Sequence, residues 1–303
     1  MTLRLGTRGS ALALAQSRHV AERVTALTGE RVELVEIVTA GDRSDQPVQQ
    51  LGVGVFVSAL RDALAAKEID FAVHSYKDLP TAGVGGLVIA AVPPREDPRD
   101  ALVARDGLTL TELPDGATVG TGALRRVAQL AALGLPLRTV PIRGNVDTRL
   151  RKVAQGELDA VVLARAGLVR LGRADEVTEI LDPMLMLPAP AQGALAVESR
   201  EDLAELLRPL DDRATRAAVT AERALLAALE AGCSAPVAAL AEVTEDDEIY
   251  LRGAVISVDG GYALKLSRTG TLAEAEQVGR LLANDLLEDG ADHVLGVQHD
   301  PRT

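Results

Sequence analysis

Strand-like and helix-like segments alternate from the N-terminus onward, and this alternation limits the fold more than any other feature of the chain. Residues 3–5 have the pattern of a strand, apolar residues then recur at helical spacing from Leu12 to Leu27, and the β-branched run 32–38 predicts a second strand. Further strand-like segments follow at residues 71–73, 118–119, 137–142, 160–163 and 195–197. Such alternation is typical of α/β folds, in which helices cover a sheet.

Two proline-rich segments divide the alternating region. Residues 93–98 separate a first α/β lobe from a second, and residues 187–190 precede a strand by which the chain returns to the first lobe. After about residue 213, a helix, strands near 250–258 and 262–267, and a last helix predict a small α+β domain. The expected domains are a first lobe of residues 1–94 and 194–212, a second lobe of residues 99–187, and an α+β domain of residues 213–303.

Composition excludes several classes of function. The net charge of -12, with two Phe, three Tyr and no Trp, argues against nucleic acid as the main partner. No apolar run reaches the length of a membrane span. The first residues have the pattern of a strand rather than of a signal peptide, and the chain has one cysteine, so we expect a cytoplasmic protein. A monomer is the default expectation, because no apolar patch for a partner is evident.

Three expected strand-to-helix turns combine glycine with arginine, at residues 6–10, 120–126 and 143–149. Glycine permits a tight turn that exposes backbone N–H groups at a helix N-terminus, where the helix dipole favours anions. Arginine adds a planar fork that can bind a carboxylate through two hydrogen bonds. Together the turns indicate a ligand with several carboxylates or phosphates. A nucleotide is the lesser option, because the P-loop and dinucleotide patterns are absent.

Two further features concern reactive side chains. The lone Cys233, in the sequence Gly-Cys-Ser-Ala-Pro, is either an inert buried thiol or a point of covalent chemistry. Asp78 follows Lys77 directly after a buried-looking strand, so it is either half of a surface ion pair or a carboxylate facing a ligand. His74 is interpreted as a structural neighbour, and the four scattered histidines indicate no metal site.

These segments together closely resemble the porphobilinogen deaminase family, also called hydroxymethylbilane synthases. The matching stretches occur in the family's order and span nearly the whole chain; they are residues 7–16, 70–80, 119–130, 142–150, 163–171, 192–194 and 222–236. The resemblance implies two periplasmic-binding-protein-like lobes with mixed sheets, plus a small α+β domain that bears the cysteine. It also implies that Cys233 carries a covalently attached dipyrromethane cofactor.

The reaction implied by the resemblance is a stepwise transfer in tetrapyrrole and haem synthesis. Four porphobilinogen molecules are added head to tail with loss of four ammonia molecules, and the linear product, hydroxymethylbilane, is hydrolysed off the retained cofactor. Asp78 is then expected to be catalytic. The remaining expected site residues are, for the cofactor, Cys233, Lys77, Asp78, Thr121, Arg125 and Arg126, and, for the substrate and growing chain, Arg8, Ser10, Arg143, Arg149 and Arg170.

Some positions depart from the family's common pattern. Ala123 stands where members often have Ser, Ala191 where a Gly commonly precedes Gln-Gly, and Val53 where some relatives have Lys. Residues 41–54 correspond to the family's mobile loop over the cleft, and we expect them to be poorly ordered without ligand. The alternatives are a non-catalytic two-lobe protein that binds polycarboxylate ligands and a degenerate relative that binds pyrroles without turnover. A simple binding protein needs neither Cys233 nor Asp78, and the presence of both, together with the main arginines, argues against a degenerate relative.

Overall fold

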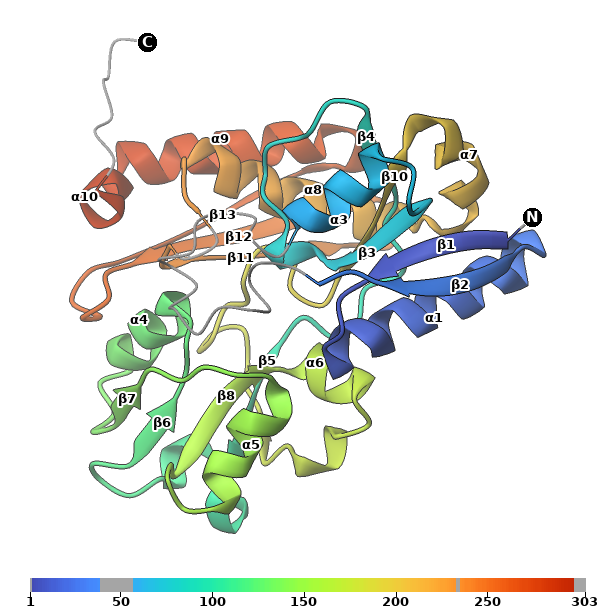
Figure 1. Cartoon of the computed structure of the whole chain (residues 1–303). Coiled ribbons are helices and arrows are strands. Elements are labelled where there is room, and N and C mark those ends of the chain that lie inside the picture. Colours follow the sequence, from blue (N-terminus) through green and yellow to red (C-terminus); the bar gives the residue numbers. More distant parts are fainter. Residues whose placement is uncertain (1, 39–56, 233–234, 297–303) are drawn as a thin grey trace. The chain divides into compact units, whose positions relative to one another are not determined.

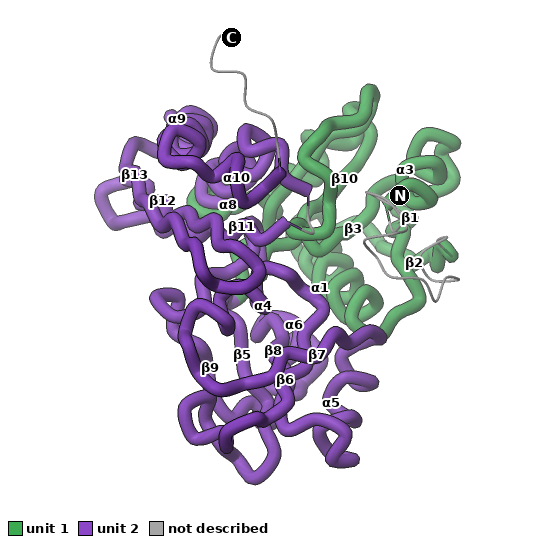
Figure 2. The backbone as a smooth tube through the Cα atoms, turned by 90° about the vertical axis from the view of Figure 1, so that its left-hand side faces the viewer, with its two compact units in different colours: residues 1–96, 193–216 green, residues 97–192, 217–303 purple. Residues whose placement is uncertain are grey.

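The computed structural model describes residues 2–38, 57–232 and 235–296. The chain forms two compact units, drawn in green and purple in Figure 2. Unit 1 comprises residues 1–96 and 193–216, and unit 2 comprises residues 97–192 and 217–303. The expected mobile loop and Val53 lie outside the described residues, as does Cys233.

Unit 1 contains a five-stranded sheet in the order β2-β1-β3-β10-β4 (Figure 1). Its strands are β1 (Thr2–Thr7), β2 (Arg31–Glu36), β3 (Phe71–Ser75), β4 (Leu87–Ala91) and β10 (Leu195–Arg200). β1 pairs in parallel with β2 and β3, whereas β10 runs antiparallel to both β3 and β4. The sheet is therefore mixed, as the sequence analysis predicted.

The described residues of unit 1 include the helices α1 (Ala11–Thr28), α3 (Ser58–Ala65) and α7 (Ala204–Leu207). The long helix α1 turns Val20 and Val24 into a core that also contains Leu5 and Phe71. α3 buries Leu60 and Leu64 in a second cluster, with Ile69 and Ala72. The apolar spacing that predicted α1 thus identified Val20 and Val24 as buried, although Leu27, at the end of that pattern, is 51% exposed.

The first half of unit 2 contains a second five-stranded sheet, in the order β7-β6-β8-β5-β9. Its strands are β5 (Asp100–Ala104), β6 (Thr118–Gly120), β7 (Arg138–Val140), β8 (Ala160–Ala164) and β9 (Glu179–Ile180), and its helices are α4 (Leu124–Ala132), α5 (Val146–Ala154) and α6 (Arg165–Arg170). β6 pairs in parallel with β7 and β8, and β5 runs antiparallel to β8 and β9.

The two sheets share one strand order. In each, the antiparallel strand in the fourth place follows a passage of the chain from the other unit: β10 in unit 1 and β5 in unit 2. The prolines of residues 93–98 and 187–190 mark these two passages. The repeat is therefore structural, although the amino-acid sequence shows no internal repeat.

The last part of unit 2 is an antiparallel three-stranded sheet with helices. It contains α8 (Arg213–Ala228), which begins in unit 1, then β11 (Val237–Val243), β12 (Glu248–Ile256), β13 (Ala263–Thr271), α9 (Ala275–Glu288) and α10 (Ala291–Leu295). α8 and α9 contribute Leu225 and Leu282 to its core. A separate apolar cluster joins Ala128 of α4 to Leu240 and Ile256 of this sheet. The fold class expected from the sequence, α/β lobes with mixed sheets plus a small α+β part, is confirmed.

Candidate functional site

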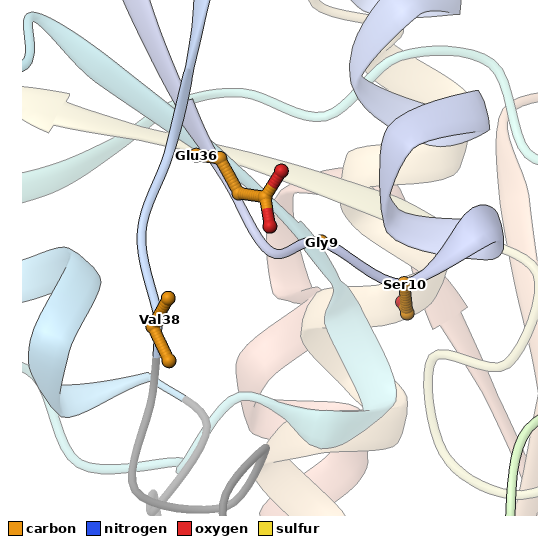
Figure 3. A pocket seen from close by; sticks show the side chains of 4 residues that line it. All are labelled: Gly9, Ser10, Glu36 and Val38. Atoms are coloured by element: carbon orange, nitrogen blue, oxygen red, sulfur yellow. The ribbon is translucent and has the colours of Figure 1, made fainter.

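The turn between β1 and α1 contains Arg8 and Ser10. Ser10 begins α1 as its N-cap, and its hydroxyl accepts a hydrogen bond from the N–H of Ala13 at 3.3 Å. Glu36, at the end of β2, turns its carboxylate toward Gly9, as Figure 3 shows. A Cβ atom at Gly9 would lie 2.1 Å from Glu36 Oε1, so a larger residue there would displace the end of the Glu36 side chain. A pocket of ≈ 260 Å³ opens here, lined by Gly9, Ser10, Glu36 and Val38.

Lys77 and Asp78 lie just beyond the C-terminal end of β3. The strand ends at Ser75, and residues 76–78 form a single turn of 3₁₀ helix. Leu79 is 2% exposed and anchors this turn, whereas the Asp78 side chain is exposed. The Asp78 carboxylate is therefore accessible to a ligand.

A buried ionic network supports the strand that leads to Asp78. His74 Nε2 lies 3.0 Å from Glu198 Oε2 on β10, and Arg61 Nε of α3 donates to Glu198 Oε1 at 2.9 Å. Burial alone would raise the pKa of Glu198, but its hydrogen bonds and electrostatic interactions with His74 and Arg61 outweigh burial and lower that pKa. His74 is 6% exposed. It is a structural residue, as the sequence analysis interpreted it.

In unit 2, Thr121 and Gly122 connect β6 to α4. Thr121 is 1% exposed, and its hydroxyl accepts a hydrogen bond from the N–H of Ala123 at 3.3 Å. A Cβ atom at Gly122 would lie 2.8 Å from the carbonyl oxygen of Ile142. Glycine is required at 122 because two backbone segments approach each other closely, and not because the turn has a left-handed conformation.

Arg125 and Arg126 occupy the first turn of α4, and both are only 5% exposed. Their side chains meet at the carboxylate of Asp100, which is fully buried at the start of β5. Arg125 Nη2 donates to Asp100 Oδ2 at 2.7 Å, and Arg126 Nη2 donates to Asp100 Oδ1 at 2.8 Å. Burial would raise the pKa of Asp100, but the two guanidinium groups hold it well below its ordinary value. The carboxylate is therefore ionised.

The turn before α5 contains Arg143 and leads to Arg149. Asn145 is the N-cap, accepting a hydrogen bond from the N–H of Thr148 at 2.9 Å. Gly144 adopts a φ of 94°, a conformation that favours glycine, and its carbonyl oxygen accepts a hydrogen bond from Arg149 Nε at 2.9 Å. The left-handed glycine thus fixes one edge of the Arg149 guanidinium group.

Arg170 is the last residue of α6 and is half-buried. Three residues later, Arg173 forms an ion pair with Asp147 in the first turn of α5. This pair connects the segment after α6 to the helix that contains Arg149. The structure therefore ties two of the expected substrate-binding segments to each other within unit 2.

Cys233 falls between α8, which ends at Ala228, and β11, which begins at Val237. β11 is hydrogen-bonded to the proline-rich segment 187–190, because the N–H of Ala239 donates to the carbonyl of Pro188 at 3.0 Å. Of the expected site residues, unit 2 contains Cys233, Thr121, Arg125, Arg126, Arg143, Arg149 and Arg170, and unit 1 contains Arg8, Ser10, Lys77 and Asp78.

Sequence reasoning missed three buried carboxylates, those of Asp100, Glu198 and Glu222. Glu222 is fully buried on α8, where Oε1 accepts a hydrogen bond from the N–H of Ala241 at 2.8 Å. Each carboxylate has polar or charged neighbours in sequence, so no local pattern marks it as buried.

The chemistry of the Arg125–Arg126–Asp100 cluster suits a polycarboxylate cofactor. Among residues 2–38, 57–232 and 235–296, two buried guanidinium groups face one buried carboxylate, which leaves one positive charge in excess. A buried cation is costly unless an anion compensates it, so the cluster favours an anionic ligand group. No group of acidic, histidine or cysteine side chains suited to a metal ion occurs among the described residues. Within residues 2–38, 57–232 and 235–296, no helix combines the length and apolarity needed to cross a membrane.

Comparisons with known proteins cover nearly the whole chain. Residues 3–208 match the family described as "Porphobilinogen deaminase, dipyromethane cofactor binding domain", and residues 216–288 match "Porphobilinogen deaminase, C-terminal domain". A porphobilinogen deaminase of Nocardia farcinica is 61% identical over 304 residues, which cover 97% of this chain and 88% of the relative. That of Mycobacterium tuberculosis H37Rv is 57% identical over 309 residues, which cover 98% of this chain and 100% of the relative.

Among solved structures, the methionine binding protein MetQ overlaps 69% of this chain and 89% of its own, at 15% identity and a TM-score of 0.44. The fold class of this chain therefore rests on its own strand order and not on that overlap. The sequence relationship is far stronger and extends through both the lobes and the α+β part. The chain belongs to the porphobilinogen deaminase family.

Proposed function

We propose that this chain is the transferase that condenses four porphobilinogen molecules head to tail, with loss of four ammonia molecules, and releases hydroxymethylbilane. The observation that carries the proposal is the buried Arg125–Arg126 pair, which shares one counter-ion, Asp100, among the described residues, in the unit that also contains Cys233. A polycarboxylate group compensates the excess charge of that cluster. A non-catalytic binding protein needs no lone cysteine in this unit, so that alternative is not favoured.

In this proposal, Cys233 anchors the dipyrromethane cofactor through a thioether, and the side chains that hold its carboxylates are Lys77, Thr121, Arg125 and Arg126. When bound, the cofactor supplies the free pyrrole position at which the chain is extended. The substrate's own acetate and propionate groups are bound by Arg8, Ser10, Arg143, Arg149 and Arg170. Several arginines are needed because every added pyrrole brings two more carboxylates.

The catalytic residue in this proposal is Asp78. Positive charge develops on the substrate's pyrrole as its ammonia leaves, and a carboxylate can stabilise that charge and accept the pyrrole N–H hydrogen bond. The same carboxylate can hold or release the proton that the ammonia departure and the new bond require. Its exposure beyond the end of β3 supports this role.

We further propose three domains: residues 1–94 with 194–212, residues 99–187, and residues 213–303. The proline-rich passages and the separate apolar core of the last part support these boundaries. We also propose that the enzyme is a cytoplasmic monomer. Sedimentation equilibrium of the purified chain tests the oligomeric state, and cell fractionation tests the compartment.

The direct test of the function is turnover. Purified protein incubated with porphobilinogen should release one ammonia molecule for each porphobilinogen consumed. It should release one hydroxymethylbilane for every four porphobilinogen molecules consumed. Ammonia release by the Cys233→Ala variant should be lost. A wild-type chain that binds porphobilinogen without releasing ammonia would show a binding protein instead.

A further inference from the structure

The buried carboxylate of Asp100 accepts hydrogen bonds from both Arg125 and Arg126, whose other hydrogen bonds go to different carbonyl groups. Arg125 Nη1 donates to the carbonyl of Leu187 at 2.5 Å, and Arg126 Nη1 donates to the carbonyl of Val162 at 2.9 Å. Gln192 Nε2 adds a hydrogen bond to Asp100 Oδ1 at 2.8 Å. Asp100, on β5, therefore connects α4 to the segment of residues 187–192.

Consecutive residues of an α-helix project in directions about 100° apart, so they do not face each other. Arg125 and Arg126 nevertheless converge on one carboxylate, each through its Nη2 atom. Without that shared acceptor, the anchors at Leu187 and Val162 would hold the two guanidinium groups along separate directions. Asp100 thus determines the relative orientation of the pair.

The structure assigns Asp100 as a positioning residue, which orients Arg125 and Arg126 toward the carboxylates of the dipyrromethane cofactor. This inference rests on the proposed function, in which the two arginines bind those carboxylates. Asp100 itself is 0% exposed, so it acts through the arginines rather than by touching the ligand.

The net charge of the cluster and the orientation of its arginines lead to opposite predictions for the rate at which the Asp100→Asn variant binds the cofactor. The variant raises the charge of the cluster from one excess positive charge to two, and charge alone would speed the binding of an anion. It also places an amide N–H where a guanidinium now donates, so at least one arginine must turn away. A positioning role therefore predicts slower cofactor loading despite the added positive charge.

The experiment follows cofactor loading in the full chain. Apo-protein is made in a host that cannot synthesise porphobilinogen, porphobilinogen is added, and intact mass is recorded against time. We expect Asp100→Asn to load at least about tenfold more slowly than wild type, since small misplacements of binding groups cost large factors in rate. Loading at the wild-type rate or faster overturns the inference.

Two further variants keep the test decisive. Asp100→Glu retains the negative charge but moves the carboxylate by one methylene, so it should also load slowly; loading at the wild-type rate overturns the inference, even if Asp100→Asn does not fold. Asp97→Asn is the matched control, because Asp97 pairs with Arg99 and Arg165 in the same region. It should load like wild type, and equal slowing in this variant would also overturn the inference.

Failure of the proposed function gives a different result. If the wild-type chain gains no mass with porphobilinogen, the function itself is wrong. If the wild-type chain loads and Asp100→Asn loads equally fast, only the role of Asp100 is wrong. Thermal unfolding of each apo-variant, measured beside the loading, separates slow loading from loss of the fold.

Discussion

Glu222 accepts a hydrogen bond from the backbone N–H of Ala191 at 2.5 Å, and Ala191 has a φ of 60°. A left-handed conformation is unfavourable for alanine, so the surrounding structure must hold it in place. The same carboxylate also accepts the N–H of Ala241 on β11. Glu222 therefore ties the segment that contains Ala191 to the sheet that follows Cys233, and its hydrogen bond helps to hold Ala191 in this conformation.

Glu222→Gln should destabilise the protein. The amide group places an N–H donor against one of the two backbone N–H groups, and a buried unsatisfied donor costs about 1–3 kcal/mol. Urea unfolding, followed by circular dichroism, measures the change in the free energy of unfolding. Glu245→Gln is the control, since Glu245 is exposed, and it should change that free energy by less than about 0.5 kcal/mol. Equal stability of the two variants would refute the bridging role.

Asp78→Ala should nearly abolish turnover and leave the fold intact. Loss of a group that transfers protons typically lowers the rate about 10²–10⁴-fold. The side chain is exposed, so the free energy of unfolding should change by no more than about 0.5 kcal/mol. Steady-state release of hydroxymethylbilane measures the rate, and Asp115→Ala, at another exposed aspartate, serves as control. Full activity of Asp78→Ala would rule out the catalytic assignment.

Arg149→Leu should slow elongation or cofactor assembly. A charge-assisted hydrogen bond contributes about 1.5–3 kcal/mol, which corresponds to a loss of about ten- to a hundredfold in kcat/KM for porphobilinogen. Arg151→Leu provides a matched control, because Arg151 is exposed in the last turn of the same helix. Unchanged kinetics in Arg149→Leu, or an equal loss in Arg151→Leu, would contradict the placement of Arg149 in the site.

The network around Glu198 predicts a pH dependence of stability. The pKa of Glu198 is lowered in the folded state, so its contribution to stability is complete above the ordinary glutamate pKa and is lost as pH falls through the folded-state value. Glu198→Gln should therefore show a shallower loss of unfolding free energy than wild type when pH falls from 7 into the acid range. Urea unfolding at a series of pH values measures both slopes. Parallel slopes would show that Glu198 does not titrate differently on folding.

Much of the fold could be predicted because local pattern and tertiary packing agree. The spacing of Val20 and Val24 gave α1, and the expected strand at 71–73 extends to Ser75 in β3. The expected strand 32–38 ends earlier, at Glu36, whose carboxylate packs over Gly9. Strand β5 was not predicted, because its first residue, Asp100, looks unsuitable for a buried strand until its arginine partners are known.

In the candidate site too, features with a local sequence pattern could be predicted, and features that depend on distant residues could not. Motifs identified Arg125 and Arg126, but an Asp100 partner that lies 25 residues away from Arg125 in sequence has no local signature. Glycine was expected to serve turn conformation in all three arginine-bearing turns. Gly144 has the left-handed φ of 94°, whereas Gly122 is needed because the carbonyl oxygen of Ile142 approaches it closely. Close approach depends on the folded neighbours, which sequence spacing does not reveal.

The measurement that tests the central claim most directly is the intact mass of the purified chain beside its Cys233→Ala variant. The account predicts that the wild-type chain carries excess mass equal to two linked pyrrole units, or gains that mass when porphobilinogen is added. The variant should have the mass of its unmodified sequence under both conditions. A wild-type chain that stays unmodified after porphobilinogen is added, or a variant that gains the same mass, would contradict the account.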